Sequence, residues 1–190
     1  MDGKISHLVR QFLLVGIAGL TLGCSTQRNS PNPANTVAAT SIPGLEPARR
    51  ISALGAWVDP PTGWRLDKHD VDAKHAHFTW LSPSGDTAYG VVLMNLPLPV
   101  GPDMVLWGFL NHLRAADKKA EILQEEHAPE LQGIRFVADS GLYRIRVNLT
   151  VHDWHAWAIY AGTVREKPER PGELLLASEA RDHTRVGLDH

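Results

Sequence analysis

The sequence contains one cysteine, Cys24, among 190 residues, so it cannot form an internal disulfide, and an apolar core must hold its folded part. Basic residues are not in excess, since 19 Lys and Arg stand against 21 Asp and Glu. A protein that binds phosphate backbones usually carries a basic surface. We therefore expect no nucleic-acid partner.

Motifs of known catalytic chemistry are also missing. The sequence has no Gly-x-Ser-x-Gly nucleophile elbow, no His-Glu-x-x-His zinc motif and no glycine-rich phosphate loop. No group of residues indicates a reaction, a metal or a cofactor. The sequence therefore predicts a protein that is not an enzyme.

No apolar run reaches the ~20 residues that a membrane-spanning helix needs. The longest one, residues 13–23 (LLVGIAGLTLG), is interrupted by glycine and follows the basic residues Lys4 and Arg10. Export signals typically have a charged start, then a short apolar stretch and then polar sequence, which here follows Cys24. We therefore expect an exported protein.

Residues 20–24 (LTLGC) resemble a bacterial lipobox. The resemblance implies that residues 1–23 are a lipoprotein signal peptide and that Cys24 is lipidated, as with palmitate, and becomes the new N-terminus. The protein would then be a lipid-anchored membrane protein of the cell envelope, with its domain on the non-cytoplasmic side. Plain secretion, or an uncleaved anchor with Cys24 as an ordinary buried thiol, are the alternatives.

The composition changes near residue 50. Residues 24–50 are rich in Pro, Asn, Ser and Thr and carry too little apolar surface to offset the entropy of ordering, so we expect a flexible tether. All six tryptophans lie beyond it. Residues 51–190 are therefore expected to form a single globular domain.

Within residues 51–190, alternating segments predict strands, and one 3.6-residue period predicts an amphipathic helix that Asp103 can cap. A short closing helix is expected at 173–181. The expected strands are 57–64 (interrupted by a turn), 75–81, 88–96, 120–126, 134–140, 142–152 and 155–164. Strands that form one sheet with helices packed on it make an α+β architecture.

Three short segments carry a family resemblance: Pro61-Thr62-Gly63-Trp64, the turn Pro83-Ser84-Gly85, and Leu131-Gln132-Gly133 before a Phe-Val-Ala strand and a late Tyr160. In this order they resemble the superfamily of the photosystem II extrinsic protein PsbP and the bacterial DcrB-like lipoproteins. The resemblance implies a single antiparallel β-sheet with helices on both faces, an α/β/α sandwich.

The same resemblance implies an accessory or binding role. We therefore expect a membrane-anchored, non-enzymatic envelope lipoprotein that binds an envelope protein or a small ligand. The alternative is a metal-dependent or hydrolase-like envelope enzyme with a site that the sequence does not reveal.

Four histidines are possible metal ligands. His75 and His77 alternate in a strand, so their imidazoles share one face of a sheet, with about 7 Å between the two Cα atoms. His152 and His155 flank a turn and could supply a third metal ligand. The simpler interpretation is that His75 and His77 lie on the polar face opposite Phe78 and Trp80, and we expect no metal site.

A group of carboxylates and a pair of tryptophans have simple structural interpretations. The carboxylates Asp67, Asp70 and Asp72 lack the glycine and glutamate of a calcium loop and are expected on a solvated surface. Trp154 and Trp157 are expected in packing and in a turn rather than in a sugar-binding platform.

The long strand 142–152 has one polar face. Arg144, Arg146, Asn148 and Thr150 alternate there with aliphatic residues. This face is either a surface for a partner, a surface that meets only water, or a face covered by a helix, in which case its polar groups must be hydrogen-bonded internally.

Overall fold

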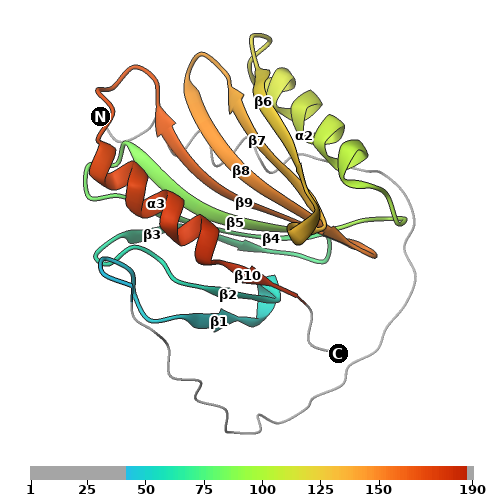
Figure 1. The fold of residues 1–190 in the computed structure, drawn as a ribbon, viewed down its shortest axis with the longest axis horizontal. Helices are drawn as coiled ribbons and strands as arrows, with labels where there is room; N and C mark the ends of the chain where they lie inside the picture. The colour runs from blue at the N-terminus through green and yellow to red at the C-terminus, as the bar shows by residue number, and fades with distance from the viewer. Residues whose placement is uncertain (1–41, 188–190) are drawn as a thin grey trace, which may run out of the picture.

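The structure, a computed structural model, describes residues 42–187, and its largest element is an antiparallel sheet of seven strands (Figure 1). Each strand pairs antiparallel with its neighbours. In spatial order the sheet consists of β3 (Arg65–Val71), β4 (His75–Leu81), β5 (Thr87–Asn95), β9 (His155–Val164), β8 (Tyr143–His152), β7 (Gly133–Asp139) and β6 (Glu121–Ala128).

The prediction of a single sheet is wrong, because a second sheet of three short strands packs beside the first. It consists of β1 (Arg49–Ile51), β2 (Ala56–Val58) and β10 (Arg185–Val186). Strands of two or three residues are too short to show an alternating pattern. Moreover, β10 pairs with a strand about 130 residues earlier in the chain, which no local pattern could reveal.

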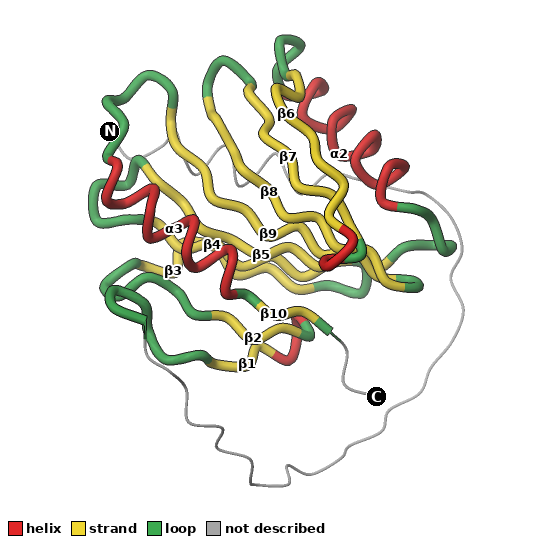
Figure 2. The backbone as a smooth tube through the Cα atoms, viewed as in Figure 1, coloured by secondary structure: helices red, strands yellow, loops and turns green. Residues whose placement is uncertain are grey.

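Two helices cover opposite faces of the large sheet (Figure 2). Helix α2 (Pro102–Ala116) packs over β6, β7 and β8, where the rings of Phe109 and Phe136 meet edge to face at 5.2 Å. It begins at Pro102, so its N-cap is Gly101 and the expected cap Asp103 lies in the first turn instead. Helix α3 (Pro171–His183) packs its buried Ala177 and Ala180 over β5 and β9 on the other face. Helices therefore lie on both faces, as expected.

The second sheet extends the core on the side of α3. Leu54, Ala56 and Val58 join Trp80 and Trp157 in one buried cluster. The indole Nε1–H of Trp157 donates to the carbonyl of Leu54 at 2.7 Å, which ties the two sheets together. Trp157 is thus a core residue, as expected, while Trp154 in the β8–β9 turn is half exposed.

The folded unit begins before residue 51. Leu45 is buried and forms a β-bridge with Pro61, and β1 begins at Arg49. Residues 42–50, which the sequence assigned to the tether, therefore contribute to the packing. Residues 1–41, with the expected signal peptide and Cys24, lie outside the described residues. Within the described part, neither helix is long and apolar enough to cross a membrane.

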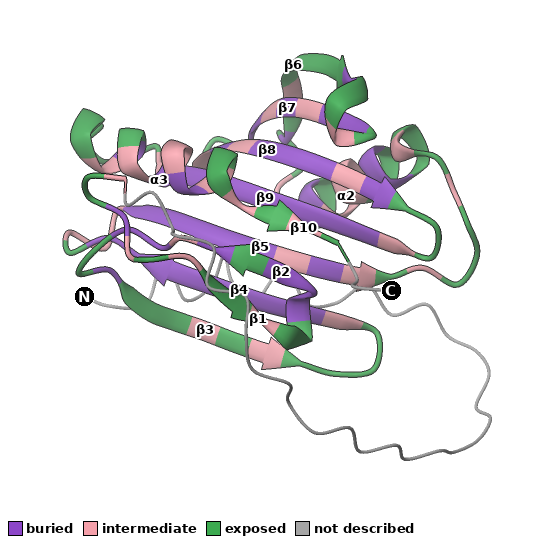
Figure 3. Cartoon of the chain, turned by 60° about the horizontal axis from the view of Figure 1, so that its bottom comes forward, coloured by how far each residue is buried: buried purple, intermediate pink, exposed green. Residues whose placement is uncertain are grey.

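Edge strand β3 was not expected, because it is exposed along most of its length (Figure 3). A strand that is wet on both faces has no buried stripe and so no alternation of apolar residues. Its charges and a register shift between Leu66 and Lys68 are features that discourage pairing with another chain.

Candidate functional site

The four histidines weighed as metal ligands have different surroundings in the structure. His77 is 1% exposed and belongs to a buried polar cluster with Thr79 and Tyr160. The distances are 2.8 Å from Thr79 Oγ1 to His77 Nε2, 3.0 Å from His77 Nε2 to Tyr160 Oη, and 2.7 Å between the two hydroxyls. His75 shares this face of the strand but turns to Asp72, its Nδ1 lying 2.9 Å from a carboxylate oxygen.

The remaining two histidines lie elsewhere. His152 pairs with Asp153 in the β8–β9 turn at 3.2 Å, and His155 lies against the ring of Trp157. Within residues 42–187 none of the four histidines belongs to a group of three potential metal ligands.

The buried cluster depends on a glycine in the strand between its members. Thr79 on β4 pairs with Gly90 on β5, and Gly90 pairs with Tyr160 on β9. A Cβ atom at Gly90 would collide with the phenol ring of Tyr160. The missing side chain therefore lets the tyrosine reach across one strand to the next.

The electrostatics of this cluster oppose acid–base chemistry. Burial, followed by the charges of Lys68 and His75, lowers the pKa of His77 to about 3. Burial raises the pKa of Tyr160 above that of a free tyrosine. Both groups are therefore neutral at pH 7, whereas a general acid or base works best with a pKa near the working pH.

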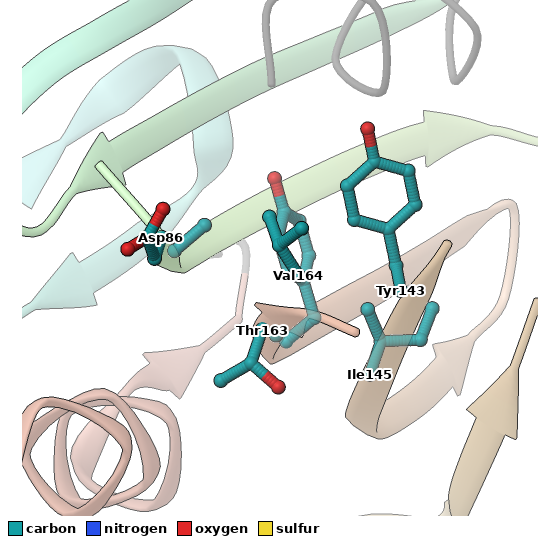
Figure 4. A pocket seen from close by; sticks show the side chains of 8 residues that line it. Asp86, Tyr143, Ile145, Thr163 and Val164 are labelled. Atoms are coloured by element: carbon teal, nitrogen blue, oxygen red, sulfur yellow. The ribbon is translucent and has the colours of Figure 1, made fainter. Parts of the chain in front are cut away.

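A shallow pocket lies next to this cluster, at the end of β5, β8 and β9 (Figure 4). Tyr143, Ile145, Val164 and Gly162 line it together with Tyr160, and Gly162 leaves space because a Cβ there would meet Ile145. Its lining is almost entirely apolar, and Asp86 at the rim is its one carboxylate. Nothing in it resembles a nucleophile with an adjacent base.

The polar face of β8 lies on the side of α3, and its four residues have different roles. Arg144 donates two hydrogen bonds to Asp139 Oδ2, at 3.1 and 2.9 Å, and Arg165 donates a third at 2.6 Å. Asn148 is buried, and its Nδ2 donates to Asp182 on α3 at 3.0 Å. Arg146 and Thr150 are half buried.

Arg146 differs from the other arginine on this face. Within residues 42–187 its guanidinium has no ion pair and no hydrogen bond. Its cross-strand neighbours are uncharged, Val137 on β7 and Ala161 on β9. Arg144 is thus a structural residue, whereas Arg146 has no polar partner within residues 42–187.

The acidic residues near β3 have structural roles. Asp67 pairs with Arg65 at 3.1 Å, and Asp70 lies 4.0 Å from Lys68. Asp72 accepts the backbone N–H groups of Lys74 and His75, and the Lys74 bond is the first of the causes that lower the pKa of this carboxyl. Asp72 therefore shapes the β3–β4 turn.

One group of possible metal ligands was not noticed in the sequence. Asp103 in the first turn of α2 faces Glu125 and His127 on β6, and one ligand atom of each lies within 4.8 Å of the others. All three are exposed, and His127 Nε2 is 3.7 Å from Asp103 Oδ1. The alternation of Glu125 and His127 was the only signal available, since the helix supplies the third residue.

Comparisons with known proteins identify the fold of this chain. No family model matches the chain, and no curated protein matches it. Among solved structures the chain is similar to the solution structure of cyanobacterial PsbP (CyanoP) from Synechocystis sp. PCC 6803. The TM-score is 0.57 with 13% sequence identity, over 82% of this chain and 100% of that chain. This chain therefore has a PsbP-like fold.

Proposed function

We propose that this chain is a membrane-anchored envelope lipoprotein whose PsbP-like domain acts without catalysis, as an accessory module that binds a partner. The observation that carries the proposal is the state of His77 and Tyr160. They form a buried histidine–hydroxyl cluster, yet both remain neutral at pH 7. Such a cluster supports packing and hydrogen bonding rather than proton transfer.

The anchor in this proposal is a lipid on Cys24. Two observations in the sequence support it: the apolar run 13–23 directly precedes this cysteine, and residues 20–24 resemble a lipobox. The chain between Cys24 and Ile42 spans 18 residues, up to roughly 60 Å when extended. A tether of that length would let the domain reach a partner at some distance from the membrane surface.

The surface that supports partner binding is the polar face of β8. Arg146 projects from a half-buried position with no internal partner among the described residues, and a cation held in this way can pair with an external anion. Envelope proteins would be captured from detergent-solubilised membranes with the wild-type chain, Arg146→Glu and Arg65→Glu. Arg65→Glu reverses an exposed charge on β3 and serves as the control.

We expect a partner that is retained with the wild type and Arg65→Glu and lost with Arg146→Glu, while the melting temperature stays unchanged. The proposal would be contradicted if the purified chain turned over a substrate and lost that activity when a single residue was replaced by alanine. That result would replace the proposal with an enzyme.

A metal-dependent function is the second candidate, and the group of Asp103, Glu125 and His127 is the observation that favours it. Two carboxylates and an imidazole are ligands that Zn²⁺ accepts. Calorimetry with zinc on the wild type, His127→Ala and His77→Ala separates the cases. We expect no heat at micromolar zinc. Heat that disappears only in His127→Ala would favour the metal-dependent alternative.

A further inference from the structure

Helix α2 carries an apolar stripe on its outer side, away from the sheet. Trp107 is the most exposed large hydrophobic residue within residues 42–187, at 67%, and Met104 is 60% exposed. One exposed apolar side chain is ordinary, but these two are three residues apart on a helix and therefore share one face. Tryptophan and methionine are also enriched where proteins meet one another. This outer face is therefore a candidate docking surface.

Gly108 leaves open space on the same face. It follows Met104 by four residues, so the two positions are neighbours on the helix. An added Cβ atom at Gly108 would meet no atom of the described residues within 4 Å. Glycine inside a helix is destabilising relative to alanine, and no close packing within the described chain requires it here. The glycine does allow the backbone of another molecule to approach Trp107.

Two exposed carboxylates border this face on the side of β6 (Figure 1). Asp103 precedes Trp107 by four residues and so lies on the same side of the helix. One ligand atom each of Asp103, Glu125 and His127 lie within 4.8 Å of one another. Within residues 42–187 neither carboxylate forms an ion pair with a lysine or an arginine, and His127 Nε2 lies 3.7 Å from Asp103 Oδ1. Two carboxylates beside one imidazole leave negative charge in excess, which favours a cation.

The aromatic ring and the carboxylates suit one kind of cation. Long side chains on a helix lean toward its N-terminus, so the indole of Trp107 leans toward the turn that holds Asp103. The guanidinium of arginine is planar, donates several N–H groups and stacks on aromatic rings. The ammonium of lysine donates as a point charge and has no flat face. This arrangement therefore favours arginine over lysine.

We propose that the outer face of α2 binds an arginine-bearing segment of a partner protein. An arginine of the segment donates to Asp103 and Glu125 and stacks on Trp107, while an apolar residue lies on Met104 beside Gly108. We call these five residues the Trp107 surface. The proposal rests on the partner-binding function proposed above, adds a surface on the other side of the sheet from the polar face of β8, and names the partner's chemistry.

The combination of charge and apolar area argues against two other occupants. A membrane surface with anionic lipids repels carboxylates, and burying them unpaired in any bilayer is costly. A zinc ion accepts two carboxylates and an imidazole, but it leaves the exposure of Trp107 and Met104 unexplained. An arginine next to an apolar residue accounts for both features.

The test is an NMR titration of the full chain in a nonionic detergent, with EDTA present so that no metal ion bridges the carboxylates. The reporter is the indole N–H signal of Trp107, which is identified by its absence in Trp107→Phe. The probes are acetyl-Ala-Arg-Leu-Arg-Ala-amide and the same peptide with Lys or with Gln in place of both Arg residues.

Matched variants separate the Trp107 surface from general effects of charge and apolar area. Asp103→Asn and Glu125→Gln each remove one carboxylate, and Met104→Ala removes apolar area. Glu126→Gln is the control for charge, because successive strand residues point to opposite faces of β6 and Glu126 is also exposed. Leu175→Ala on α3 is the control for apolar area, since Leu175 is 60% exposed, like Met104.

We expect the Arg peptide to bind at least about tenfold more tightly than the Gln peptide and about threefold more tightly than the Lys peptide. Asp103→Asn and Glu125→Gln should each weaken this binding by about three- to tenfold, and Met104→Ala by about threefold. The two controls should change it by less than twofold.

Equal binding of the three peptides, or losses in the controls as large as those in the matched variants, would overturn the proposal. A Trp107 signal that shifts with detergent concentration and with none of the peptides would also overturn it, in favour of a lipid surface. Each of these outcomes removes the Trp107 surface alone, because the capture experiment with Arg146→Glu and the anchoring at Cys24 are measured separately.

Discussion

Gly90 on β5 leaves the space through which the side chain of Tyr160 on β9 crosses to β4. The two residues are direct cross-strand partners, and a Cβ at position 90 would overlap the phenol ring. The tyrosine hydroxyl therefore meets Thr79 and His77, two strands away from its own backbone. One residue without a side chain thus allows a polar cluster to form from two distant parts of the sequence.

Gly90→Ala should therefore destabilise the protein, by about 1–3 kcal/mol, because the added methyl forces Tyr160 out of its place. The free energy of unfolding from chemical denaturation measures this. Gly108→Ala in α2 is the matched control, since nothing lies within 4 Å of a Cβ there. It should stabilise the helix by about 0.5–1 kcal/mol. A neutral or stabilising effect at Gly90 would contradict the packing described.

His77 should make stability depend on pH below neutrality. Its pKa is about 3 in the folded state, and in the unfolded chain it returns to about 6.5. Between these values the unfolded state binds more protons, so the folded state loses stability as pH falls from 6.5 toward 3. The slope for this one group is at most about 1.4 kcal/mol per pH unit.

His77→Gln should reduce that slope, as measured by denaturation between pH 7 and pH 5. His152→Gln, which changes an exposed histidine, should leave the slope as it is. An NMR titration in which the His77 imidazole gains a proton near pH 6.5 would contradict the assignment of a neutral, buried ring.

Charge reversal should separate the two arginines of β8. Arg144→Glu places a carboxylate against Asp139, which is 8% exposed, and should cost about 1–3 kcal/mol. Arg146→Glu should change the free energy of unfolding by no more than about 0.5 kcal/mol, because it breaks no hydrogen bond or ion pair with a described residue. Equal losses in both variants would show that Arg146 has a structural role.

The sequence predicted the elements with strong periodicity. The strand expected at 75–81 coincides with β4, and the long strand at 142–152 differs from β8 by one residue. Their alternating patterns arise because one face packs against the core. The charged edge strand β3 and the second sheet were missed, since neither has a buried stripe long enough to produce a pattern.

The candidate sites were harder to predict, because they depend on partners far away in the chain. His77 was expected on a polar face, and that face is buried here because Tyr160, 83 residues later, reaches across Gly90. The sequence grouped Arg144 with Arg146, but only the fold shows that Arg144 pairs with Asp139, which also accepts a hydrogen bond from Arg165. Alternation in the sequence identifies the residues that share one face of a strand, whereas tertiary contacts determine what covers that face.

The most direct test of the account is membrane fractionation of cells that express the wild type or Cys24→Ser, with metabolic labelling by palmitate. We predict that the wild type is labelled and sediments with membranes. The Cys24→Ser variant should carry no label and should be either released as a soluble protein or left as an uncleaved precursor. A variant that remains in membranes at the processed size of the wild type would contradict the proposed lipid anchor.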